Sequence, residues 1–307
     1  MSITFFNMFY DAASKGKRRL AFYNDIADMS LSLWGITRTE LEQQHLIRDR
    51  DVDRIHGTGT LEATRQAASG GLISISASRL WPQWRDHRDP AWLYPNLDYR
   101  WDSILSTLGG SLGKTERAID WMLANNISPK RIYDWGAGPG FTTLLLAKVF
   151  PNAEVHFNEY PGSPLCQIFE WFRKKFDLNN VSYVSGPLGK YDLIEALEVV
   201  EHFPLLDAAG HRVHEDGEYI GDAWGPCRDL LTANLDSGGH LIWNTVFAAE
   251  RNNDVLGHFR VYDIDGLRVP FHRAGGFFRK ALASSPINMQ TVLERKFVDG
   301  VWMFRRP

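Results

Sequence analysis

After residue 112, the apolar positions of the chain alternate between two periods. Runs that are short and apolar, or apolar at every second position, predict strands at 131–134, 153–161, 181–186, 190–203 and 238–247. Between them, apolar residues recur at helical spacing and predict helices at 115–126, 141–150, 164–178 and 225–235. Strands that alternate with helices indicate an α/β fold with a mostly parallel sheet over residues 113–307.

The part of the chain before residue 113 follows a helical pattern. Residues 1–56 are expected to be mainly helical, with one apolar stripe that consists of Leu20, Tyr23, Ile26, Ala27, Leu31 and Trp34. Thr37 and Glu40 have the spacing of a capping box, so a helix is expected to begin there. We therefore expect an N-terminal helical, aromatic-rich extension, residues 1–112, and an α/β domain, residues 113–307.

Aromatic residues are concentrated in segment 81–102 of this extension. They are Trp81, Trp84, Trp92, Tyr94, Tyr99 and Trp101, and the prolines among them exclude one long helix. One interpretation is a cap over a substrate, because aromatic rings stack on planar groups and attract cations. The alternative is that the rings pack the extension onto the α/β domain, or form a subunit interface in a homo-oligomer.

The segment LGGSLGKTE, residues 108–116, superficially resembles a phosphate-binding loop. A Walker A loop needs four residues between its first glycine and the Gly-Lys pair. Three residues separate Gly109 from Gly113-Lys114, so the motif fails. The sequence instead predicts a loop, followed by a helix with Thr115 as its N-cap.

The sequence RIYDWGAGPG, residues 131–140, predicts a ligand site. Gly136, Gly138 and Gly140 allow a tight turn with positive φ and let a ligand approach the backbone closely. The helix expected to follow presents free N–H groups and the positive end of its dipole to such a ligand. A dinucleotide fingerprint would place its last glycine at position 141, which is Phe141.

The form D-x-G-x-G-x-G, with Asp134 as its acid, resembles the first motif of class I S-adenosylmethionine (SAM)-dependent methyltransferases. Glu159 lies about 20 residues beyond the turn, where an acid is expected to bind ribose hydroxyls. The fourth strand runs into Glu198-x-x-Glu201-His202, as in many of these enzymes, and Asp299-Gly300 predicts a C-terminal hairpin with an antiparallel last strand. The resemblance implies a three-layer Rossmann-like α/β domain.

The resemblance also implies site residues. The cofactor SAM would contact Asp134, Gly136, Ala137, Gly138, Gly140, Glu159 and Glu198. The third strand runs into Ser185-Gly186-Pro187, so the acid that often binds the adenine amino group is missing there.

His202 and Glu201 are the candidate catalytic residues. A histidine titrates near neutrality and can act as a general base. Two alternatives remain: a structural role in the pocket wall, or a metal site formed by Glu198, Glu201 and His202 with a distant histidine such as His258. The long connection at 207–225 is expected either to line the acceptor pocket or to form a solvated loop.

Composition limits the partners. The net charge of −3 gives no general electrostatic reason to bind nucleic acid, and two cysteines among 307 residues suggest a reducing compartment. Long apolar runs are absent, so no membrane span is expected, and we predict a cytoplasmic protein.

The sequence therefore predicts a SAM-dependent methyltransferase that modifies an oxygen, nitrogen or carbon atom of a small molecule. The alternatives are a metal-assisted RNA 2′-O-methyltransferase, a dinucleotide-dependent oxidoreductase, and a non-catalytic binding or assembly protein that retains the fold.

Overall fold

The computed structural model describes residues 3–11, 15–41, 80, 90–244, 259–284, 286–294 and 301–307. Its centre is a seven-stranded sheet with the order β11-β12-β8-β4-β1-β2-β3. The strands are β1 (Arg131–Asp134), β2 (Glu154–Phe157), β3 (Val181–Tyr183), β4 (Tyr191–Leu197), β8 (Leu235–Asn244), β11 (Gln290–Glu294) and β12 (Trp302–Arg305).

The strand directions confirm the predicted fold class. Strands β3, β2, β1, β4 and β8 pair in parallel, whereas β12 runs antiparallel between β8 and β11. All five core strands predicted from the sequence are present, and so is the C-terminal hairpin. The Asp299-Gly300 turn itself lies outside the described residues. The arrangement is the three-layer Rossmann-like α/β fold that the sequence predicts.

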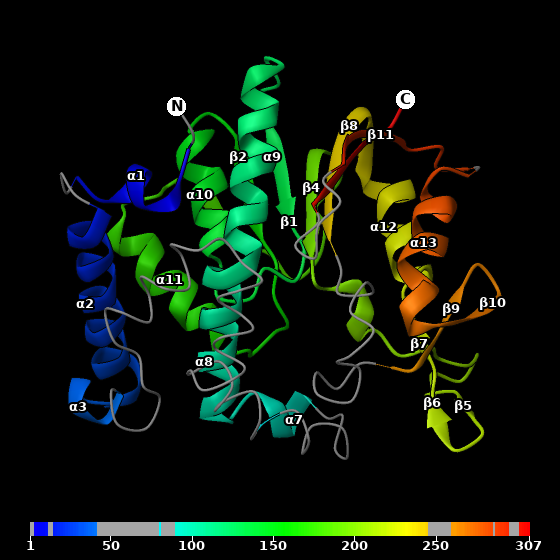
Figure 1. The fold of residues 1–307 in the computed structure, drawn as a ribbon, viewed down its shortest axis with the longest axis horizontal. Coiled ribbons are helices and arrows are strands. Elements are labelled where there is room, and N and C mark those ends of the chain that lie inside the picture. The colour runs from blue at the N-terminus through cyan, green and yellow to red at the C-terminus, as the bar shows by residue number, and fades with distance from the viewer. Residues whose placement is uncertain are drawn as a thin grey trace.

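Helices cover both faces of the sheet because its strands are apolar on both sides. Ile132, Leu193, Ile242 and Met303 belong to one buried cluster, whereas the adjacent Tyr133, Ile194, Leu241 and Phe304 belong to another. On the first face lie α9 (Leu112–Ala124), α10 (Phe141–Val149) and α11 (Leu165–Lys175). On the second lie α12 (Gly225–Asn234) and α13 (Phe271–Leu282), and Figure 1 shows these two groups on opposite sides of the sheet.

The N-terminal helices add an outer layer to the first face. They are α1 (Phe5–Phe9), α2 (Lys15–Trp34) and α3 (Arg38–Glu40). The ring of Phe22 on α2 lies 5.5 Å from the ring of Phe141 on α10 and 5.7 Å from that of Phe172 on α11. Aromatic contacts of this kind bury large apolar areas, so the described N-terminal helices share a hydrophobic core with the α/β domain.

Two predictions for this layer have different outcomes. The capping box is confirmed, since Thr37 and Glu40 exchange side-chain and backbone hydrogen bonds. The predicted apolar stripe is wrong in part: Tyr23, Ile26 and Ala27 are buried, but Leu20 and Leu31 are exposed. Phe22 and Met29 are buried on the same helix, so the buried face is rotated relative to the predicted stripe.

The loop expected at residues 108–114 is helical. The segment α8 (Leu97–Ser106), the π-helical turn η2 (Thr107–Ser111) and α9 follow one another without interruption. Thr115 is therefore not an N-cap: it is fully buried within α9, and its hydroxyl donates a hydrogen bond to Glu195 Oε1 (2.7 Å). Position 112, the predicted domain boundary, lies inside this helical run.

Two small sheets, which the sequence pattern did not predict, lie below the carboxyl ends of the central strands in Figure 1. One consists of β5 (His214–Glu215) and β6 (Glu218–Tyr219), and the other of β7 (Gly221–Asp222), β9 (Val261–Ile264) and β10 (Leu267–Pro270). The connection after β4 is thus partly ordered as strands. None of the helices within the described ranges is long and apolar enough to cross a membrane.

Candidate functional site

The glycine turn lies where the strand order reverses. From β1 the sheet extends through β2 and β3 in one direction and through β4 and β8 in the other. Ligands of open α/β sheets bind at the carboxyl ends of the strands at this switch point. The turn connects β1 to α10 at this position, and Gly136, Gly138 and Gly140 all have positive φ, at 63°, 58° and 78°.

The three glycines have different surroundings. A Cβ atom on Gly136 would lie 2.8 Å from Val199 Cγ2, and one on Gly140 would lie 2.6 Å from Phe169 Cδ2. A Cβ on Gly138 would meet no atom of the described residues within 4 Å. Gly138 is therefore the position at which the turn leaves room for a ligand, whereas its two neighbours are held by packing.

Glu159 follows β2 and lies next to that opening. The N–H of Gly138 donates a hydrogen bond to Glu159 Oε2 (2.9 Å), although the two residues are 21 positions apart. Glu159 is 7% exposed, and burial raises the pKa of its carboxyl to about 7, against the hydrogen bonds from Tyr160 and Gly138. The carboxyl thus ionises near neutral pH.

Asp134 lies beneath the turn. It is 2% exposed, and its Oδ2 accepts hydrogen bonds from the hydroxyls of Thr142 (3.0 Å) and Thr143 (2.5 Å) in the first turn of α10. Burial raises its pKa to about 6, while the two hydroxyls oppose that rise. Glu195 is its register partner on β4 and is fully buried, and burial together with the charge of Asp134 raises its pKa as well. Asp134 thus fixes the strand, turn and helix relative to one another.

The three candidate residues after β4, Glu198, Glu201 and His202, differ in how deeply their side chains are buried. Glu198 has a positive φ of 57° and a half-buried side chain that accepts hydrogen bonds from Lys114 and Asn244. Glu201 is fully buried in the short 3₁₀ turn η3 (Val200–His202), and its carbonyl accepts a hydrogen bond from the hydroxyl of Tyr262 (2.8 Å). His202 is exposed. Of the two candidate catalytic residues, His202 therefore has access to solvent and Glu201 does not.

Aromatic side chains surround the carboxyl ends of β1 and β2. Tyr94, between α7 (Pro90–Leu93) and α8, stacks on Tyr160 with 5.1 Å between ring centroids. Trp135, in the glycine turn, stacks on Phe203 at 5.1 Å. Trp101 is fully buried against Trp34. Of the tryptophan-rich segment, the described part thus packs the extension and also reaches Glu159 through Tyr160, whereas Trp81 and Trp84 lie outside the described residues.

Of the four residues in the metal-site hypothesis, the structure describes Glu198, Glu201 and His202. Within the described parts of the chain, no group of three or more His, Cys, Asp or Glu side chains is arranged to hold a metal ion. His258, the distant histidine of that hypothesis, lies outside these parts.

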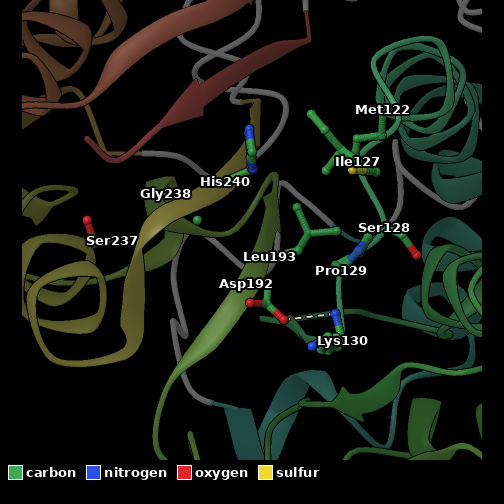
Figure 2. A pocket seen from close by; sticks show the side chains of 11 residues that line it. Met122, Ile127, Ser128, Pro129, Lys130, Asp192, Leu193, Ser237, Gly238 and His240 are labelled. Atoms are coloured by element: carbon green, nitrogen blue, oxygen red, sulfur yellow. Dashed lines mark hydrogen bonds between the residues drawn. The ribbon is translucent and has the colours of Figure 1, made fainter.

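A cavity of about 300 Å³ lies at the other end of the central strands, next to the amino ends of β1 and β4 (Figure 2). Its lining includes Asp192, whose carboxylate accepts hydrogen bonds from the N–H groups of Lys130 (2.8 Å) and Arg131 (2.9 Å). Asp192 thus fixes the entry into β1. The cavity is distant from the glycine turn because the turn follows the carboxyl end of β1.

No family model and no curated protein matches the chain. Among solved structures, the pyocyanin biosynthetic protein PhzM is 14% identical, with a TM-score of 0.47, over 86% of this chain and 76% of that chain. N-methyltransferase NodS from Bradyrhizobium japonicum WM9, solved with S-adenosyl-L-homocysteine, is 14% identical, with a TM-score of 0.41, over 76% and 99% of the two chains. An O-methyltransferase family protein from Burkholderia thailandensis is 11% identical, with a TM-score of 0.41, over 96% and 95%.

Sequence reasoning missed two polar residues at the site, Lys114 and Asn244. In the sequence, Lys114 stands out only as part of a segment that resembles a phosphate-binding loop but does not complete its motif. Asn244 is the last residue of β8 and has no motif of its own. The position of Asn244 is a signal once the strand order is known, because the end of β8 lies beside the end of β4.

Proposed function

We propose that the protein is a SAM-dependent methyltransferase that acts on an oxygen, nitrogen or carbon atom of a small molecule. The observation that carries the proposal is the pair Gly138 and Glu159: an open position in a glycine turn, hydrogen-bonded to a buried acid at the end of the next strand. This pairing suits a nucleoside, because the turn admits it to the backbone and the acid accepts hydrogen bonds from its two ribose hydroxyls.

The residues at the switch point fit SAM in their chemistry. The backbone of Gly136, Ala137, Gly138 and Gly140 would face the cofactor, while Asp134 supports the turn from below. Glu159 would bind the ribose and Glu198 the amino-acid end. When bound, SAM supplies a methyl group on a sulfonium, which is already a good leaving group, so the protein's main tasks are to align the acceptor and to remove its proton where needed.

For the acceptor, we propose His202 as the general base, with the buried Glu201 as part of its support. An exposed imidazole can exchange its proton with solvent after each turnover. The stacked pairs Tyr94–Tyr160 and Trp135–Phe203 offer flat apolar walls, which suit a small planar acceptor. The net charge of −3 favours such an acceptor over a nucleic acid.

The test is titration calorimetry with SAM and S-adenosylhomocysteine, with NADPH as comparator. We expect binding of both sulfur compounds at micromolar Kd and no binding of NADPH. Glu159→Gln should weaken S-adenosylhomocysteine binding by about tenfold or more, because a charged hydrogen bond contributes about 1.5–3 kcal/mol.

The affinity for S-adenosylhomocysteine should also depend on pH, because the carboxyl of Glu159 has a pKa of about 7. Affinity in the wild type should fall as pH decreases below about 7, since the carboxyl loses its charge there, and Glu159→Gln should remove that dependence. If well-folded protein bound neither sulfur compound, a non-catalytic protein that retains the fold would replace this proposal.

A further inference from the structure

Lys114 has an unusual position for a lysine. It lies in the first turns of α9, its side chain is 4% exposed, and its Nζ lies 2.5 Å from Glu198 Oε1. An ammonium group has three N–H donors. Among the residues that the structure describes, Glu198 is the one acceptor within hydrogen-bond distance of this group. Because a buried ammonium is stable only when its donors are satisfied, Lys114 has capacity for a further negatively charged or polar partner.

Glu198 shows the complementary feature. Its Oε1 accepts both hydrogen bonds, from Lys114 Nζ and from Asn244 Nδ2 (3.3 Å), and within the described residues no hydrogen bond reaches Oε2. Its side chain is 28% exposed, so the carboxylate is held on one side and open on the other. Its backbone has a positive φ of 57°, and such strain in a residue with a Cβ is typical of functional sites.

This ion pair adjoins the glycine turn on the side opposite Glu159. Val199, the next residue after Glu198, packs against Gly136. Glu159 approaches the same turn from β2, on the other side of β1, and binds Gly138. A ligand in the turn would therefore meet a carboxylate suited to hydroxyl groups at one end, and both a cation and an anion at the other.

We propose that Lys114 and Glu198 together recognise the amino-acid end of the cofactor, Lys114 through its carboxylate and Glu198 through its ammonium group. The inference rests on the proposed function and extends it to a residue of the α8–η2–α9 helical run. An α-amino acid is a zwitterion, and its two charges match the two groups of the pair. The carboxylate would fill the donor capacity of Lys114, and the ammonium would bind the open side of Glu198.

The experiment compares three ligands by titration calorimetry. S-adenosylhomocysteine carries both the carboxylate and the ammonium, S-adenosyl-3-thiopropylamine carries the ammonium alone, and 5′-methylthioadenosine carries neither. They are measured on the wild type, on Lys114→Met, and on Lys174→Met, a control on α11 whose lysine is 70% exposed.

Lys114→Met should weaken S-adenosylhomocysteine binding about 10- to 100-fold, because a charge-assisted hydrogen bond contributes about 1.5–3 kcal/mol. It should change the Kd of the other two ligands less than about threefold, because a substitution that removes no contact to the ligand usually changes a free energy by no more than about 0.5 kcal/mol. Lys174→Met should bind all three as the wild type does. An equal loss for all three ligands, or an unchanged Kd for S-adenosylhomocysteine, would overturn the assignment.

Two measurements cover the case in which Lys114→Met does not fold. Lys114→Arg keeps the charge and should retain most of the preference for S-adenosylhomocysteine over the thiopropylamine. In the wild type that preference should itself be at least about tenfold, and equal affinities would contradict the proposal. If the wild type bound 5′-methylthioadenosine but showed no such preference, this inference would fail and the proposed function would stand. If it bound none of the three, both would fail.

Discussion

At the scale of single residues, the glycine turn offers a controlled comparison. Gly136, Gly138 and Gly140 all have positive φ, so alanine at any of them adopts an unfavourable backbone conformation at a cost of about 1–2 kcal/mol. The positions differ in what a Cβ would contact: among the described residues, no atom lies within 4 Å of a Cβ on Gly138, whereas Val199 and Phe169 lie within 3 Å of one on Gly136 and Gly140. Alanine substitutions at these positions can therefore distinguish a glycine that is needed to admit a ligand from one that is needed for packing.

Gly138→Ala should lower the free energy of unfolding by about 1–2 kcal/mol, the conformational part alone. It should weaken S-adenosylhomocysteine binding at least about tenfold, because the methyl group occupies the opening. Gly140→Ala should lose about 1–3 kcal/mol more in stability, because its methyl group would lie 2.6 Å from Phe169 Cδ2. Urea denaturation and calorimetry on both variants provide the measurement, and wild-type affinity in Gly138→Ala would disprove that the opening holds the ligand.

The sequence could predict the motif but not this division of roles. The spacing of the glycines and of Glu159 is local information, and the structure places those residues together. The neighbours of each glycine, Val199 and Phe169, come from distant segments, and no periodicity specifies them. The ion pair of Lys114 was not predictable from the sequence for the same reason, because its partner Glu198 is 84 positions away.

At the scale of elements, the regular strands and helices were predictable and the irregular ones were not. Adjacent glycines at 109–110 favour a loop by propensity, yet tertiary packing keeps them in the π-helical turn η2. The strands β5 and β6, with two residues each, are too short for a periodic signal, whereas β9 and β10 are as long as β1 and were not predicted. Their turns did carry one: Asp216-Gly217 and Asp265-Gly266 are Asp-Gly pairs in which both residues have positive φ, as a two-residue hairpin requires.

The outer helix α2 tests whether the extension is part of the folded core. Phe22→Ala should lower the free energy of unfolding by about 3–5 kcal/mol, because Phe22 is fully buried among rings from α1, α10 and α11. Leu31→Ala, on the same helix at 56% exposure, should change it by no more than about 0.5 kcal/mol. Urea denaturation followed by tryptophan fluorescence compares the two, and equal effects would show that α2 is not docked through Phe22.

At the scale of the whole molecule, the extension and the α/β domain are connected by more than apolar packing. The N–H of Phe5 donates a hydrogen bond to Glu116 Oε1 (2.7 Å) on α9, and the N–H of Ile3 donates one to Asp120 Oδ1 (3.0 Å). These bonds tie the first helix of the chain to the helix that precedes β1. The division at residue 112 stays a prediction, because a boundary of independent folding requires measurement on the separate parts.

The stability of the whole molecule should also depend on the acids beneath the glycine turn. The pKa of Asp134 is about 6 in the folded protein, against an ordinary value of 3.8. The folded state therefore holds this proton more tightly than the unfolded chain does. The resulting stability is complete below about pH 4 and is lost as pH rises through about 6, and burial of Glu195 acts in the same direction.

Asp134→Asn removes the titration of this carboxyl but keeps a side-chain oxygen that can accept the hydrogen bond from the hydroxyl of Thr143. Relative to the wild type, the variant should gain about 2–3 kcal/mol in free energy of unfolding between pH 4 and pH 7.5, because most of the difference between a pKa of 3.8 and one of about 6 is expressed in this range. Only the difference between the two proteins is interpreted, because exposed acids with lowered pKa, such as Glu154 and Glu170, change the stability of both in the opposite sense.

Asp229→Asn, at a 71% exposed position, is the control, and its free energy of unfolding should change with pH in parallel with that of the wild type across this range. A constant difference between Asp134→Asn and the wild type from pH 4 to pH 7.5 would show that Asp134 is already ionised in the folded protein at pH 4, and that the turn is built around a buried charge.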